Sequence, residues 1–297
     1  MSLLQLPPIT DASATPGSST TITPGSLSTN SRSSLATNSR GSSTTNSRTR
    51  PAKTPAEEVA FEIAEQRQDL YDAFKLVGDA YHASGLMPNR KFPIRVTPYH
   101  LLPTTEVFVT RMAGEIVSTV SLIGDGFLGL PISSMYPDET SVLRESGLRF
   151  AEIGALADRR ESPSRFLKTF LPMMRLLTQV ARIRGYDGLV AACHPKHARL
   201  YQRMLPFERI GGETGCEYAN GNPAVMLAVH FEWHHGSDHY QRFFGDMPSV
   251  ETLCPRPWSR ETREYFRKFL QSDDQRADQI VDGCLSFAAL TGRYHAG

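Results

Sequence analysis

The stretch between residues 148 and 193 constrains the fold more than any other part of the chain. It starts with an apolar run, LRFAEIGALA (148–157), and ends with a second one, YDGLVAAC (186–193). The segment between them, 164–185, has the apolar spacing of a long amphipathic helix. Two strands joined in this way form a parallel pair with a crossover connection. Because no glycine-rich turn follows the first strand, a dinucleotide-binding sheet is not expected.

Segments on both sides of this unit also carry strand or helix patterns. The expected strands are 92–100, 105–112, 115–124, 207–212 and 223–231, with a tight turn at Ala113-Gly114. The other expected helices are 56–85, as one or two helices that end at Gly85, and 135–147 and 196–205. This order predicts the α+β class, with a mixed, mostly antiparallel sheet flanked by helices.

Composition divides the chain into three parts. Residues 1–55 are rich in Ser, Thr and Asn and repeat the tetrapeptide TNSR at 29–32, 37–40 and 45–48. No repeat carries a core residue, so we expect a disordered tail and not a solenoid. Residues 56–232 should form the main domain. Residues 233–297, with the patterns SRETREYFRKFLQSDD and DQIVDGCLSFAAL, should form a helical C-terminal extension.

Charge and cysteine content argue against several classes of protein. The net charge is +1, which provides no electrostatic basis for binding nucleic acid. Four cysteines are spread without a CxxC pair, which is typical of a reducing compartment and not of a disulfide framework. No uncharged apolar run approaches the roughly 18 residues of a membrane span, and the N-terminus lacks a signal-peptide pattern. We therefore expect a cytoplasmic protein without integral membrane contact, whose oligomeric state the sequence leaves open.

Three segments resemble a known group of acyltransferases. They are VFVTRMAGEIVSTVSLIGDGFLGLPISSMYPDE (107–139), RFAEIGALA (149–157) and CHPKHARLYQRMLPFERIGG (193–212). Over about residues 60–232, the chain resembles the FeeM-type N-acyl amino acid synthases, relatives of the acyl-homoserine-lactone synthases in the GNAT acyltransferase superfamily. The resemblance implies a GNAT-like fold and transfer of a fatty acyl group from a thioester to the amine of an amino acid.

Glu152 is the candidate general base for this reaction. It lies in an otherwise apolar strand, where burial should raise its pKa. The resemblance matches it to a glutamate of the lactone synthases that is followed by Ser and Arg, where this chain has Gly154 and Ala155. The backbone at these two residues is the candidate site for the oxyanion and the acyl group. The alternative is that Glu152 points outward or pairs with a residue such as Arg149.

Tyr201 is the candidate acid that protonates the leaving thiolate. The resemblance matches it to a tyrosine that precedes a Gly-Phe turn in many GNAT enzymes, although Pro206 replaces the glycine of that turn here. The alternative is a half-buried aromatic residue on a helix.

Four charged residues are candidates for binding the acceptor amino acid. A carboxylate could bind its amino group, and an arginine could bind its carboxylate through a bidentate fork. The candidates are Asp125 and Glu139 for the amino group, and Arg95 and Arg111 for the carboxylate. The alternative is that these charges lie solvated on loops and strand edges.

The expected donor site lacks a feature of the acetyl-CoA enzymes with this fold. Those enzymes hold the CoA pyrophosphate with a glycine-containing turn, and the same position here reads DRRESPSRFLK (158–168), without glycine. This favours the phosphopantetheine thioester of an acyl carrier protein as donor over acyl-CoA, with no permanently bound cofactor. Its single phosphate and the acidic carrier surface fit a set of four basic residues, Arg159, Arg160, Arg165 and Lys168. The alternative is a solvated helix start.

The segment CHPKHARLY (193–201) combines a thiol with two imidazoles. Cys193 ends a strand and Pro195 breaks it, so His194 and His197 need not face the same way, and no fourth ligand follows at a zinc-like spacing. A second histidine cluster at 230–239 has no HExxH order. We expect no metal site, and a cysteine–histidine dyad would need an orienting group that the sequence does not show. We interpret the segment as a strand end, a loop and a helix start.

The leading hypothesis is a transferase that moves a long-chain fatty acyl group from an acyl carrier protein to the amine of an amino acid. An acyl-CoA- or acetyl-CoA-dependent N-acyltransferase of a small amine is the alternative with the same fold. A non-catalytic acyl-binding module is the alternative from a different class. The sequence determines neither the amino acid nor the length of the acyl chain.

Overall fold

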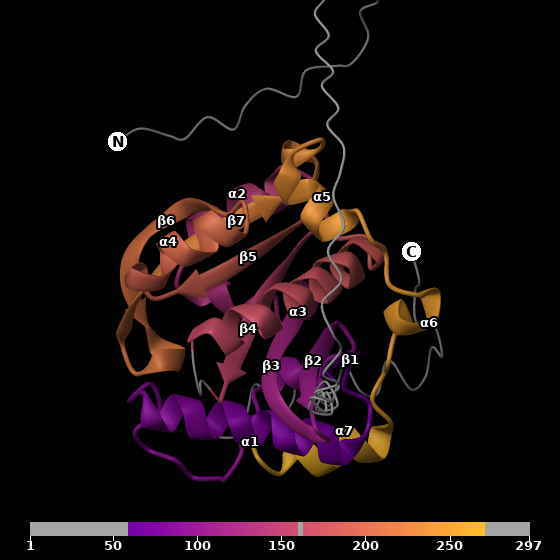
Figure 1. Ribbon diagram of the computed structural model, residues 1–297. Helices are drawn as coiled ribbons and strands as arrows, with labels where there is room; N and C mark the ends of the chain where they lie inside the picture. The colour runs from indigo at the N-terminus through magenta and orange to yellow at the C-terminus, as the bar shows by residue number, and fades with distance from the viewer. Residues whose placement is uncertain (1–58, 160–162, 271–297) are drawn as a thin grey trace, which may run out of the picture. The chain divides into compact units, whose positions relative to one another are not determined.

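The computed structural model describes residues 59–159 and 163–270, which form one sheet with helices on both faces (Figure 1). The strands are β1 (Val59–Ile63), β2 (Thr105–Met112), β3 (Glu115–Gly124), β4 (Phe150–Asp158), β5 (Gly188–Cys193), β6 (Glu208–Cys216) and β7 (Asn222–His230). They lie in the order β1-β2-β3-β4-β5-β7-β6, and each neighbouring pair is antiparallel except β4 and β5. The α+β class and the parallel pair are confirmed.

Helices cover the sheet in two layers. They are α1 (Arg67–Ala83), α2 (Pro137–Glu145), α3 (Pro163–Ile183), α4 (Pro195–Met204), α5 (Asp238–Phe244), α6 (Val250–Leu253) and α7 (Arg260–Arg267). One layer contains α3, α4 and α5, and the other contains α1, α2 and α7. We call the two sides of the sheet the α3 face and the α1 face; Figure 1 looks onto the α3 face. Within the described ranges, no helix is both long enough and apolar enough to cross a membrane.

The prediction of helix throughout 56–85 is wrong in its first part. Residues Val59–Ile63 form β1, which pairs with β2 along the edge of the sheet, and α1 begins only at Arg67. Val59, Phe61 and Ile63 follow the two-residue period of a strand. Pairing with a distant segment decides between the two conformations here, because the local pattern is compatible with both.

The prediction of a strand at 92–100 is also wrong. The segment makes one isolated bridge, from Val96 to Leu270, and ends in the 3-10 helix η1 (Pro98–Leu101). Its prolines have no N–H group for a ladder, which disfavours a strand inside a sheet. The segment instead runs beside α1, where the Arg95 N–H donates to the Phe74 carbonyl at 3.0 Å.

The remaining expected elements are present at similar bounds. Ala113 and Gly114, the turn between β2 and β3, have φ angles of 49° and 84°. Two successive positive φ angles are the conformation of a tight type I′ hairpin, as predicted. At the end of β5 the chain passes directly into α4 at Pro195, which confirms the interpretation of CHPKHARLY as a strand end and a helix start.

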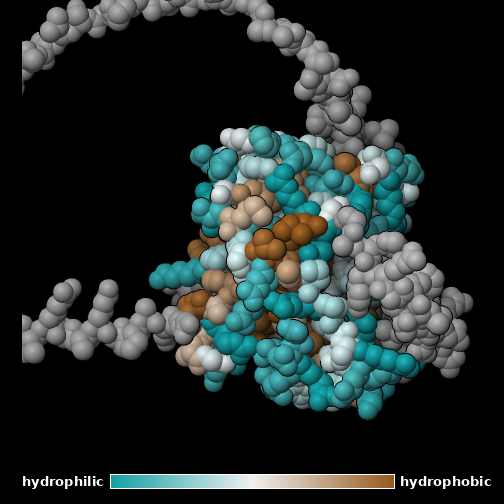
Figure 2. Space-filling model, turned by 90° about the vertical axis from the view of Figure 1, so that its right-hand side faces the viewer, coloured by the Kyte–Doolittle hydropathy of each residue, from teal (hydrophilic) through white to brown (hydrophobic). Residues whose placement is uncertain are grey.

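The C-terminal helices pack into the domain. Phe266 of α7 and Trp258 lie edge to face against Phe74 of α1, with ring centroids 5.2 and 5.8 Å from it. On the α3 face, the Gln179 amide donates to the carbonyl of Phe243 at 2.6 Å. On the side next to α6, hydrophobic side chains form small groups among hydrophilic ones (Figure 2). The predicted helical character of the C-terminal region is confirmed up to residue 270, while DQIVDGCLSFAAL and the tail 1–55 lie outside the described residues.

Candidate active site

β4 and β5 pair only over part of their length. The parallel ladder joins Phe150–Glu152 to Gly188–Val190, and no pairing is formed beyond it. β5 nevertheless continues to Cys193, bonded there to β7 alone. The two strands therefore separate directly after Glu152, and backbone N–H groups of β4 beyond this point are not used by β5.

β4 also contains a bulge at this place. Ala155 and Leu156 together lie opposite Val120 of β3, so that β4 has one extra residue. Ala155 has a φ of 50°, a left-handed conformation that costs a non-glycine residue about 1–2 kcal/mol. At Gly154, an added Cβ would meet only the Ile123 side chain within 4 Å. The candidate oxyanion residues thus form a strained backbone segment, which is a frequent feature of functional sites.

The Glu152 side chain is buried, at 6% exposure, on the α1 face. One carboxylate oxygen accepts a hydrogen bond from the Ile132 backbone N–H at 2.7 Å. Burial raises the pKa of Glu152 to about 8, although the bond from Ile132 lowers it. Neither alternative for this residue fits, because Glu152 does not point outward and the Arg149 guanidinium lies over the Tyr186 ring. Glu152 is therefore an acid that can lose and regain a proton near neutral pH.

The segment GLPISS explains how a backbone N–H reaches Glu152. It forms the 3-10 helix η2 (Pro131–Ser134), whose first residue is a proline without an N–H group. The N–H of the second residue, Ile132, has no partner within this short helix, and it donates to Glu152. The bond joins two segments that are 20 residues apart in the chain.

Further polar side chains lie on the α1 face in the neighbourhood of Glu152. His100 and Ser121 are 3% and 1% exposed, and His100 Nε2 lies 3.3 Å from Ser121 Oγ. Tyr81 lies near Glu152: burial raises the pKa of Tyr81, and the Glu152 charge adds to this. The Arg95 guanidinium lies over the Tyr81 ring, 4.8 Å from its centroid, and donates to the Tyr218 carbonyl at 2.8 Å.

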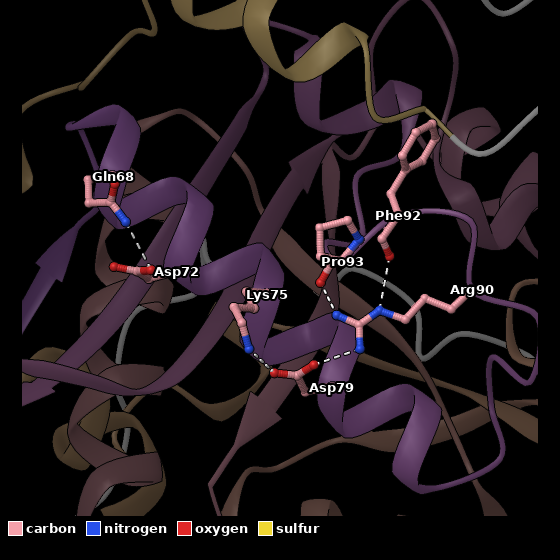
Figure 3. A network of polar contacts seen from close by, with 7 residues as sticks. All are labelled: Gln68, Asp72, Lys75, Asp79, Arg90, Phe92 and Pro93. Carbon is pink, nitrogen blue, oxygen red and sulfur yellow. Dashed lines mark hydrogen bonds and ion pairs between the residues drawn. The ribbon is translucent and has the colours of Figure 1, made fainter.

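The loop that precedes Arg95 has polar contacts with α1 and within itself (Figure 3). Arg90 donates to the carboxylate of Asp79 at 2.7 Å, to the carbonyl of Phe92 at 2.9 Å and to the carbonyl of Pro93. These bonds tie the loop to α1 directly before Arg95. In the described parts of the chain, no carboxylate forms an ion pair with Arg95, so it is the predicted acceptor-binding residue that fits the site best.

The other three predicted acceptor-binding residues are engaged elsewhere. Arg111 lies within 2.9 Å of Asp69 and 3.6 Å of Glu62. Asp125 accepts two hydrogen bonds from Arg144, at 2.7 and 3.0 Å, which fasten α2 to the end of β3.

Glu139 lies in the first turn of α2. Its charge acts on Tyr136: burial, and next the Glu139 carboxylate, raise the pKa of Tyr136 to about 12. The structure shows no contact that brings Glu139, Asp125 or Arg111 to Glu152, and we leave these three out of the proposed acceptor site.

Tyr201 lies on the α3 face, opposite to Glu152. Its ring packs edge to face against Phe170 and Phe207, with centroids 5.9 and 6.4 Å away. It comes from α4, which begins next to the open end of β5. Cys193 also lies there; burial raises the pKa of its thiol to about 11, so it is not a thiolate near neutral pH.

The predicted phosphate-binding set is described only in part. Arg159 directly follows β4 and pairs with Glu115 at 2.6 Å, and Lys168 is exposed on α3. Arg160 and the side chain of Arg165 lie outside the described residues.

Comparison with known proteins identifies the family. The model of the N-acyl amino acid synthase FeeM matches residues 72–230, more than half of the chain. The structure of FeeM, an N-acyl amino acid synthase from uncultured soil microbes, superposes with a TM-score of 0.53 and 25% identity, over 63% of this chain and 98% of that one. The structure of the AHL synthase LasI superposes with a TM-score of 0.50 and 13% identity, over 65% of this chain and 98% of that one. No curated protein sequence matches.

The chain belongs to the FeeM family of N-acyl amino acid synthases. It is an N-acyltransferase with a GNAT-like fold, as the sequence resemblance implies. For this FeeM-family member, the β4–β5 separation and Glu152 are the centre of the candidate active site.

Sequence reasoning missed three residues of this site. Ile132 binds Glu152 through its backbone, which leaves no trace in residue type. His100 lies in the segment that was expected to be a strand. Ser121 had a usable signal, because it is a polar residue within a strand whose inner positions are mostly apolar.

Proposed function

We propose that this FeeM-family enzyme transfers a long-chain fatty acyl group from the phosphopantetheine thioester of an acyl carrier protein to the α-amine of an amino acid. The observation that carries the proposal is Glu152, a buried acid with a pKa of about 8 at the point where β4 and β5 separate. α-Amines have a pKa of about 7.7–8.0 in peptides and roughly a unit higher in free amino acids, so passing the proton to Glu152 costs on the order of 1.4 kcal/mol.

The two faces of the sheet support separate entry of the two substrates. Arg95, which has no ion-pair partner among the described side chains, suits the carboxylate of an amino acid on the α1 face. The aromatic surroundings of Tyr201 suit the apolar acyl chain on the α3 face. The thioester carbonyl would then lie between β4 and β5, beside the bulge at Ala155.

The reaction at this place needs the amine to be deprotonated and the leaving thiolate to be protonated. The Glu152 carboxylate takes one proton from the acceptor ammonium group, and the free amine attacks the thioester carbonyl carbon. The backbone N–H groups of β4 beyond Glu152 donate to the oxyanion of the tetrahedral intermediate. The C–S bond then breaks, and Tyr201 gives a proton to the leaving thiolate and regains one from the nitrogen. Glu152 releases its proton to solvent, and the products are an amide and a free thiol.

Two features support a carrier protein as the donor. The segment 158–168 has no glycine to build a pyrophosphate-binding turn. Lys168 is exposed on α3 beside this segment and can meet a phosphate or an acidic carrier helix. Such a donor needs no permanently bound cofactor, and it implies a cytoplasmic reaction.

The test compares donors of equal chain length with the purified full-length protein. Acyl carrier protein and CoA thioesters of one long-chain acid are supplied with a mixture of amino acids, and products are identified by mass spectrometry. We expect long-chain N-acyl amino acids, with a kcat/KM at least about tenfold higher for the carrier-protein thioester, since CoA lacks the acidic carrier surface and the loss of one charge-assisted contact costs roughly this much. Comparable or better turnover with acetyl-CoA alone would overturn the proposed donor. Products in which the acyl group is attached to amines but never to amino acids would overturn the proposed acceptor.

A further inference from the structure

A buried pair of side chains, His100 and Ser121, lies on the α1 face and has no role in the steps above. His100 belongs to η1, and its ring packs edge to face on Phe74 of α1 with a centroid distance of 4.8 Å. Ser121 belongs to β3, and its hydroxyl oxygen lies 3.3 Å from His100 Nε2. Burying two polar side chains costs free energy unless their donors and acceptors form hydrogen bonds.

The hydrogen bonds of His100 determine which nitrogen carries the proton. The Thr97 backbone N–H points at His100 Nδ1, at 3.0 Å. A backbone N–H can only donate, so Nδ1 is the acceptor and the proton of the neutral ring is on Nε2. Burial, and next the charge of Arg95, lower the pKa of His100 to about 3, so the ring is neutral at physiological pH.

This tautomer makes Ser121 a hydrogen-bond donor. The Nε2–H of His100 donates to Ser121 Oγ, which leaves the hydroxyl hydrogen free to point elsewhere. Within the described ranges, no other group forms a hydrogen bond with this hydroxyl. A buried hydroxyl whose hydrogen has no acceptor is suited to a ligand oxygen.

The register of the sheet places this donor next to Glu152. Ser121 is paired with Gly154, and Ile123 with Glu152, so both polar side chains are on the α1 face, two residues apart along neighbouring strands. Diagonal neighbours of this kind are about 7–8 Å apart, which a bound amino acid can span through hydrogen bonds from its amine and its carboxylate. Arg95, which lies close enough to His100 to lower its pKa, brings a positive charge to the same side.

We propose that Ser121, held as a donor by His100, binds the α-carboxylate of the acceptor amino acid together with Arg95. Glu152 then meets the amine of the same molecule. Ser121 is a specificity-determining residue in this arrangement, because a hydroxyl donor and a guanidinium favour acceptors that carry a carboxylate. His100 is a positioning residue that acts through Ser121. The inference rests on the proposed function, since it assumes an amino acid as acceptor.

The first test uses Ser121→Ala with two acceptors, an amino acid and its neutral amide. A hydrogen bond to a charged group contributes enough that its loss should raise KM for the amino acid about ten- to a hundredfold. KM for the amide should rise clearly less, by about two- to tenfold, because its neutral carbonyl oxygen loses a weaker hydrogen bond than a carboxylate does. Ser118→Ala is the matched control: Ser118 is also buried in β3 but donates to the Ala157 carbonyl at 3.1 Å, and neither KM should change.

The outcomes separate this inference from the function on which it rests. Equal changes of KM for both acceptors, or no change for either, would overturn the role of Ser121 while wild-type synthesis of N-acyl amino acids stands. A wild-type enzyme that acylates only amines without a carboxylate would overturn both. His100→Gln keeps an amide donor close to the position of Nε2, so it should raise KM for the amino acid less than Ser121→Ala does.

Nitrogen-15 NMR of the His100 imidazole tests the assigned tautomer without any measurement of turnover. We expect His100 to show the Nε2–H tautomer from pH 5 to pH 8. A protonated ring or an Nδ1–H tautomer in this range would overturn the assignment of Ser121 as a donor, whatever the kinetic results.

Discussion

The two sides of the sheet differ sharply at the place where β4 and β5 separate. The α1 face carries Glu152, the hydrogen-bonded pair of His100 and Ser121, and the cation Arg95, whose charge acts on Tyr81 and His100. On the α3 face, Tyr201 lies between aromatic rings of α3 and of the loop after α4. One face thus carries polar and charged side chains, and the other carries aromatic ones.

The comparison shows how one strand can serve two substrates. Successive residues of a strand point to opposite faces, so Glu152 lies on the α1 face while its neighbours Ala151 and Ile153 enter the apolar core on the α3 face. Where the two strands pair, these faces are sealed from each other. Where the pairing stops after Glu152, groups that enter from opposite sides can meet.

The largest expected effect comes from removing the acid on the α1 face. Glu152→Gln keeps an acceptor for the Ile132 N–H but cannot take a proton, so we expect kcat to fall about 10²- to 10⁴-fold. In the wild type, kcat should rise with pH through about 8, as Glu152 loses its proton, and this limb should be absent in the variant. Steady-state kinetics between pH 6 and pH 9.5 measure both. A variant within a few-fold of the wild type would remove Glu152 from the mechanism.

The same variant should change the pH dependence of stability. Glu152 has a pKa of about 8 in the folded protein and an ordinary value of 4.5 in the unfolded chain, so the unfolded chain loses this proton first as pH rises. Wild-type stability therefore decreases between pH 4.5 and pH 8, and Glu152→Gln removes this decrease. The difference in free energy of unfolding between Glu152→Gln and the wild type should therefore be about 3 kcal/mol more favourable to the variant at pH 7 than at acidic pH. Denaturant unfolding at pH 4.5 and pH 7 measures the difference, and a difference that is independent of pH would contradict the raised pKa.

The next effect concerns the cation on the α1 face. Arg95→Gln should raise KM for the acceptor about ten- to a hundredfold, because a charge-assisted bond to the substrate carboxylate is lost. Arg111→Gln is the matched control, since Arg111 is already engaged by Asp69 and Glu62. Initial rates at varied amino acid concentration distinguish the two. Equal changes in both variants would show a general effect of charge and not a binding contact.

A smaller effect is expected on the α3 face. Tyr201→Phe removes the proposed proton donor but keeps the ring that packs on Phe170, so kcat should fall about tenfold while the protein stays folded. The loss is below the usual range for general acids, because a thiolate with a pKa near 8.5 leaves readily. Single-turnover measurement of thiol release checks this step. An unchanged rate of thiol release in the variant would show that Tyr201 contributes to packing only and is not the proton donor.

The smallest effect is expected for a carboxylate outside the site. Asp125→Asn breaks the bidentate pair with Arg144, which is partly exposed and contributes about 1 kcal/mol or less to the free energy of unfolding. Activity and KM should stay close to wild type. Thermal unfolding and kinetics of the same sample test this, and a large rise of KM for the acceptor would return Asp125 to the acceptor site.

The sequence by itself determined the order of strands and helices around the crossover, the family, and the importance of Glu152. These follow from local information: the period of apolar residues, the turn at Ala113-Gly114, and one acid inside an apolar strand. It did not distinguish Arg95 from Arg111, which carry the same charge in similar segments.

Only the tertiary structure decided between them, because the pairing of a charge depends on distance in space. Arg95 meets the carbonyl of Tyr218, which is 123 residues away, and Arg144 reaches Asp125 from another element. The bulge at Ala155 and the tautomer of His100 depend in the same way on partners from other segments. Long-range contacts of this kind leave no periodic signal in the sequence, and they decide which of several similar side chains remains available for chemistry.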